Sequence, residues 1–218
     1  MEPTSSAKRP LSWSGLSSLF SHPDAFFSGA YNLRHFGSFV VVFVMWSNSG
    51  NGILGGFNDH FLTGSLNDDL LENYLNTSKA EWSLGFGDLI LQSFASIFMF
   101  GFGFFWFFFK ATICGFRPKS NIGLLAAVYL YAEAVMHIPL LAHRILQAIV
   151  YADPTIAMLD TNQTLFRICC FVLQVLSVFV GYRAVQILFG LTGTKTKVWF
   201  WSLPLFFYGF RFLTTVLS

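Results

Sequence analysis

Five apolar stretches, separated by short polar segments, account for most of the chain. They cover residues 36–57, 86–109, 122–150, 165–191 and 198–217. A helix needs about 20 apolar residues to cross a bilayer, so each stretch is long enough to span one. The pattern predicts an all-α fold, a polytopic membrane bundle of about five transmembrane helices. We expect residues 36–218 to form this single transmembrane domain.

Residues 1–35 precede the first stretch, and we expect a cytoplasmic segment with an amphipathic N-terminal helix there. Trp13, Leu16 and Phe20 recur at helical spacing among serines. Such a helix suits either the membrane surface or a packed position against the bundle, and the sequence leaves both open. The run from His22 to Asp24 predicts a helix break and restart, because Pro and Asp both suit a first turn.

Composition agrees with a membrane protein. The 218 residues are 54% hydrophobic and only 11% charged, with 28 Phe and six Trp, whereas a soluble domain is about 25% charged. The formal net charge is +2, and no basic run exceeds two residues. A nucleic-acid partner is therefore not expected.

Basic residues predict the orientation of the bundle in the membrane. Lys79 is the only Lys or Arg in the predicted outer loops. In membrane proteins the short loops on the cytoplasmic side carry an excess of Lys and Arg. We therefore predict a cytoplasmic N-terminus and an outside C-terminus, in a bacterial inner membrane or, alternatively, an ER or Golgi membrane. The basic residues on the predicted cytoplasmic side are Lys8, Arg9, Arg34, Lys110, Arg117, Lys119, Lys195 and Lys197.

Motifs for chemistry are missing from the sequence. It contains no Gly-x-Ser-x-Gly elbow and no phosphate-binding loop, and its three Cys form no disulfide framework. His137 and His143 lie on different helix faces and make a poor metal site. We expect no catalytic residue, no metal and no cofactor.

Glu133 and His137 lie four residues apart and share one face of the third predicted span. An ionisable group at bilayer depth costs about 2.5–3.5 kcal/mol on insertion scales, which makes it a functional candidate. The pair could serve a proton or ion relay, or it could hold helices together. Arg211 lies at nearly the depth of Glu133, and Arg183 lies shallower. We predict a buried-charge cluster of these four residues, in which Glu133 pairs with Arg211 first and Arg183 second.

Two groups of small residues are further candidates. Gly101 and Gly103, within an aromatic run, predict close helix packing. The polar interruption of the 36–57 stretch is either a broken-span binding site or the start of an outer loop. Its candidate residues are Asn48, Gly50, Asn51 and Gly52.

Six segments of the chain carry a further pattern: Leu19–Phe27, Phe104–Lys110, Gly115–Ser120, Tyr129–Pro139, Val180–Gln186 and Thr192–Lys195. Together these segments resemble the Yip1-domain family of five-span membrane proteins, as a prokaryotic-type member. The resemblance covers residues 19–218, and the chain lacks the acidic-aromatic-Gly-Pro motif of the longer eukaryotic N-terminal regions.

The resemblance implies a membrane scaffold or adaptor without catalysis. Its partners would be membrane lipids and other integral membrane proteins, a second copy of the chain included. One alternative is a small transporter or permease subunit that uses Glu133, His137 and the broken first span. Another is an accessory subunit of a larger membrane complex.

Overall fold

The computed structural model describes residues 13–28, 86–117, 122–151, 160 and 162–217. The elements formed by these residues are all helical, with no strand among them. The predicted span at 36–57, with its Asn48–Gly52 break, lies outside the described residues. The helices are α1 (Trp13–Ser21), α2 (Pro23–Ser28), α6 (Phe86–Ile113), α7 (Ile122–Val150), α9 (Gln163–Phe189), α10 (Thr194–Lys197), the π-helix η1 (Val198–Ser202) and α11 (Leu203–Leu217).

The long helices coincide with the predicted apolar stretches. The 122–150 stretch has the bounds of α7, and α6 and α9 begin within two residues of the predicted starts. The last stretch, 198–217, comprises η1 and α11. By length and composition, two helices in the described part of the chain are candidate membrane spans, Ile122–His143 and Thr164–Phe189.

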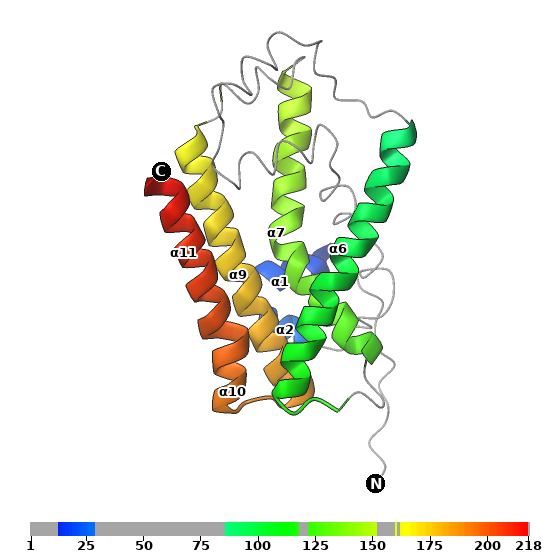
Figure 1. The fold of residues 1–218 in the computed structure, drawn as a ribbon, viewed down its shortest axis with the longest axis vertical. Coiled ribbons are helices and arrows are strands. Elements are labelled where there is room, and N and C mark those ends of the chain that lie inside the picture. Colours follow the sequence, from blue (N-terminus) through cyan, green and yellow to red (C-terminus); the bar gives the residue numbers. More distant parts are fainter. Residues whose placement is uncertain (1–12, 29–85, 118–121, 152–159, 161, 218) are drawn as a thin grey trace.

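Helices α6, α7, α9 and α11 lie side by side, and successive ones run in opposite directions (Figure 1). The end of α6, the start of α7 and the short α10 therefore lie toward the same end of the bundle (Figure 1). That end carries Lys110, Arg117, Lys195 and Lys197, which are four of the basic residues predicted to share a side.

Glycines with positive φ end two of the long helices. Gly190 follows α9 with φ 64°, and its N–H donates to the carbonyl of Gln186. Gly115 follows α6 with φ 99°, and the next residue, Phe116, donates its N–H to the carbonyl of Ala111. Because L side chains rarely adopt these φ values, glycine suits both turns.

Helix α7 forms the centre of the bundle, and the N-terminal helices pack against it. Leu19, Phe26 and Phe27 are almost completely buried, whereas Phe20 is 40% exposed. The Phe26 ring meets the Tyr131 ring edge-on at 5.2 Å, and α2 lies along α9 (Figure 1). Of the two positions that the sequence left open, the structure has the packed one.

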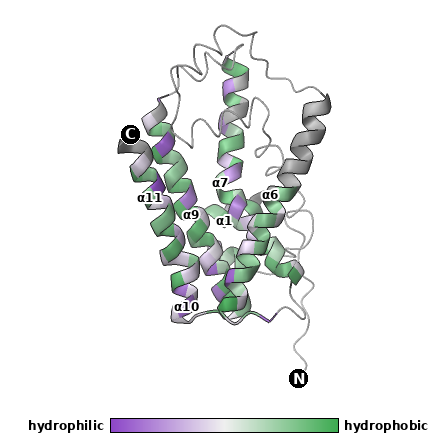
Figure 2. Cartoon of the chain, viewed as in Figure 1, coloured by the Kyte–Doolittle hydropathy of each residue, from purple (hydrophilic) through white to green (hydrophobic). Residues whose placement is uncertain are grey.

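Hydrophobic residues make up most of the long helices (Figure 2), and many of their large apolar side chains are exposed on the outside of the bundle. In the apolar, membrane-length part of α9, only 17% is buried within the chain, whereas in the corresponding part of α7 56% is buried. The exposed Phe side chains of α6 and α11 are Phe98, Phe102, Phe105, Phe109, Phe206, Phe207 and Phe210.

Candidate functional site

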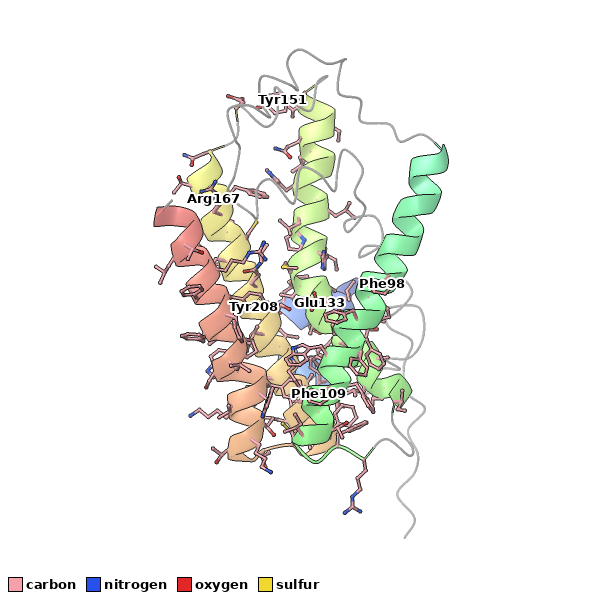
Figure 3. All side chains as sticks on the ribbon, in the orientation of Figure 1. Phe98, Phe109, Glu133, Tyr151, Arg167 and Tyr208 are labelled. Carbon is pink, nitrogen blue, oxygen red and sulfur yellow. The ribbon has the colours of Figure 1, made fainter. Side chains whose placement is uncertain are left out.

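Glu133 lies about halfway along the bundle (Figure 3). It belongs to a group of ionisable side chains. One turn further along α7, His137 Nε2 lies 3.5 Å from Glu133 Oε2, and both side chains are partly buried. The i, i+4 spacing that the sequence predicted to share a face thus brings the two groups together. The contact becomes an ion pair when His137 is protonated.

Tyr208 of α11 lies at about the same height in the bundle as Glu133 (Figure 3), and its hydroxyl is within electrostatic range of both Glu133 and Arg211. Glu133 also acts electrostatically on Tyr129 of its own helix and on Lys110 of α6. We call Glu133, His137, Tyr129, Tyr208 and Arg211 the central cluster. Three of its members come from one face of α7, and the other two come from α11. The pairing of Glu133 with Arg211 stays a prediction.

Arg183 has a partner that the sequence did not suggest. Its Nε donates to Asp24 Oδ1 at 2.8 Å, and its Nη2 donates to Asp24 Oδ2 at 2.7 Å. Asp24 sits in the first turn of α2, where a carboxylate is favourable. The arginine proposed as second partner of Glu133 therefore links the N-terminal helices to α9.

Lys110 is mostly enclosed at the end of α6 and interacts with aromatic rings. Its Nζ lies 4.9 Å from the centroid of Phe200 and 5.4 Å from that of Phe107. Such cation–π contacts stabilise a cation by about 0.5–2 kcal/mol. Phe200 is in the π-helix η1, a departure from α geometry that often occurs at functional positions.

The two candidate packing glycines have different surroundings. A Cβ at Gly103 would overlap the hydroxyl of Tyr129 and lie 3.1 Å from its Cζ. A Cβ at Gly101 would meet no described atom within 4 Å. Of these two candidates, Gly103 is therefore the one at a close helix contact.

Three residues of these sites were missed by sequence reasoning. Asp24 was read as a helix-start residue, and Lys110 was counted only as a cytoplasmic charge. Tyr208 lies ten residues after Val198, at nearly the depth of Glu133, so a search for tyrosines at that depth would have found it.

Among the described residues, no three His, Cys, Asp or Glu side chains gather into a group that could hold a metal ion. No protein-family model, curated protein or solved structure matches this chain.

Proposed function

We propose that the chain is an integral membrane scaffold or adaptor, which binds other integral membrane proteins and lipids and catalyses no reaction. The observation that carries this proposal is the aromatic outer surface of α6 and α11. Leaving apolar area in water costs roughly 25 cal/mol per Å², so a surface of this kind suits lipid or a partner helix. The resemblance to the Yip1-domain family favours the same class.

The proposal includes five spans with the N-terminus in the cytoplasm and the C-terminus outside, in a bacterial inner membrane. The position of the turn after α6 and of α10 at one end of the bundle supports this orientation. Lys110, Arg117, Lys195 and Lys197 belong to that end, and cytoplasmic segments carry such residues.

Site-specific photo-crosslinking in cells tests the scaffold proposal. A benzophenone amino acid at Phe102 of α6 or Phe206 of α11, both exposed, should give a discrete adduct with another membrane protein. The same group at the buried Phe26 or Phe200 is the matched control and should give none. Absence of protein adducts from both exposed positions would contradict the proposal.

Transport is a second candidate function, which the central cluster favours. Glu133, His137 and Tyr208 place titratable groups together in the middle of the bundle. A small proton- or ion-coupled transporter, or a permease subunit, would carry current across proteoliposomes. Glu133→Gln would abolish that current, whereas the scaffold proposal predicts none from the unaltered protein. An accessory subunit of a larger complex would instead purify with one partner at fixed stoichiometry.

A further inference from the structure

Positive charge collects where α6 ends and α10 begins. Lys195 is exposed, and both it and Lys110 act electrostatically on Cys114 at the end of α6. Three acidic side chains in the described part of the chain lie in pairs elsewhere. These pairs are Asp24 with Arg183, Glu133 with His137, and Asp160 with Tyr151.

Three kinds of contact join α6 to the α10–η1 segment at this end. The ammonium group of Lys110 sits against the Phe200 ring, and the Cys114 thiol is within range of a polar interaction with the buried Thr196. The third contact is aromatic and involves Trp199 of η1. The position of Lys195 relative to α6 is therefore fixed by packing on both sides of it in the sequence.

Two tryptophans and a phenylalanine form the aromatic part of this contact. The Trp199 ring meets the Trp106 ring at 6.2 Å and the Phe109 ring at 6.4 Å, both edge-on. Trp106 and Phe109 stack at 5.6 Å, and both stay partly exposed. Tryptophan favours the boundary between headgroups and acyl chains because its ring is apolar and its N–H is polar.

Lys195 belongs to this surface by helical spacing. It lies four residues before Trp199, the spacing that places two residues on one side of a helix, whereas Lys197 lies only two residues before Trp199; we infer from this spacing that Lys195 shares the side of Trp199. We call Lys195, Trp199, Trp106 and Phe109 the aromatic–basic corner.

We propose that the aromatic–basic corner binds an anionic phospholipid, with Lys195 on the phosphate and the aromatic rings against the glycerol and upper acyl chains. The inference rests on the proposed membrane location and names the class of lipid. A cation next to a partly exposed tryptophan pair matches a molecule with a phosphate above an apolar chain. A free phosphate ion would match the lysine alone.

The test uses the full chain in mild detergent, titrated with phosphatidylglycerol that carries brominated acyl chains. Bromine quenches nearby tryptophans, and the chain has six of them, so the saturable quenching that is lost when Trp106 and Trp199 are both replaced by Phe reports binding at the corner. Lys195→Gln should weaken binding about fivefold, as expected for one lysine near an anionic lipid. Lys197→Gln removes the same charge at the same end and should change binding by less than about twofold. Lys195→Arg should restore binding.

Three outcomes would overturn the inference. Equal quenching by brominated phosphatidylcholine would show that the anionic headgroup is not recognised. Equal effects of Lys195→Gln and Lys197→Gln would reduce the contact to general surface charge. Displacement of the lipid by millimolar inorganic phosphate at constant ionic strength would identify a free-phosphate site. If one of these outcomes is found but Phe102 or Phe206 still cross-links to a protein, the lipid site is refuted and the scaffold proposal is not.

Discussion

Arg183 of α9 binds Asp24 of α2 through two hydrogen bonds, across 159 positions in the sequence. The guanidinium also donates from Nη1 to Gln186 Oε1 at 3.0 Å, which holds it in place on α9. Phe26 and Phe27, two and three residues after Asp24, are buried. Charge and apolar packing together therefore fix the N-terminal helices to the bundle.

Apolar packing should contribute more to this docking than the ion pair. Phe27→Ala should lower stability by about 3–5 kcal/mol, as for a buried aromatic that leaves a cavity. Phe20→Ala is the matched control, because Phe20 belongs to the same N-terminal segment but is 40% exposed. Thermal unfolding in mild detergent compares the two, and equal losses would refute the packed position of the N-terminal helices.

The ion pair should give the docking a dependence on pH. Hydrogen bonding to Arg183 lowers the pKa of Asp24 below its ordinary value of 3.8. The contribution is therefore complete above pH 3.8 and is lost as the pH falls through the lowered folded-state pKa. The Asp24 side chain is 55% exposed and the Arg183 side chain is 35% exposed. Because solvent screens such a pair, the ion pair contributes only about 0.2–1 kcal/mol to stability.

Asp24→Asn provides the comparison for this pH effect. The unaltered protein should unfold at a higher temperature than Asp24→Asn at neutral pH, and the difference should close below pH 3.8. A difference that is the same on both sides of that value would assign the effect to something other than the Asp24 charge.

Gly103 should tolerate no side chain, in contrast to Gly101. Gly103→Ala should cost about 1–3 kcal/mol by overpacking against Tyr129. Gly101→Ala should be neutral or stabilise the helix by up to about 1 kcal/mol. Tyr129→Phe removes the overlapping hydroxyl and should recover part of the loss at Gly103. Identical unfolding midpoints for the two alanine variants would contradict the close contact.

Glu133 and Arg211 should be coupled through the central cluster. Both act on the Tyr208 hydroxyl, and each is costly at bilayer depth without a partner. We expect Glu133→Gln with Arg211→Gln to be better tolerated than the sum of the single changes. Expression level and melting temperature of the three variants measure this coupling, and strict additivity would mean that the two residues are independent.

The bounds of α6, α7 and α9 could be predicted because a bilayer-length run of apolar residues allows few other structures. The placement of the N-terminal helices could not be predicted, because an apolar stripe on a helix can face either lipid or the other helices of the bundle. Leu16 and Leu19 form that buried stripe with Phe26 and Phe27, whereas the spacing had suggested Phe20.

Long-range partners were the other part that sequence reasoning could not reach. Depth along the helices placed Arg183 and Arg211 near Glu133, but depth does not say which way a helix faces. Arg183 faces Asp24, a residue from a segment without a predicted depth. The π-helix at Val198–Ser202 has no sequence signature. It positions Phe200, whose ring lies against Lys110, and it also positions Trp199.

Cysteine labelling in intact cells tests the central claim, a membrane bundle with its basic end in the cytoplasm. In a background without the native cysteines, Lys197→Cys and Asn162→Cys place an exposed thiol on α10 and at the start of α9. With the basic end in the cytoplasm, a membrane-impermeant maleimide should label Asn162→Cys in intact cells and Lys197→Cys only after lysis. Labelling of Lys197→Cys in intact cells, or of neither position until lysis, would contradict it.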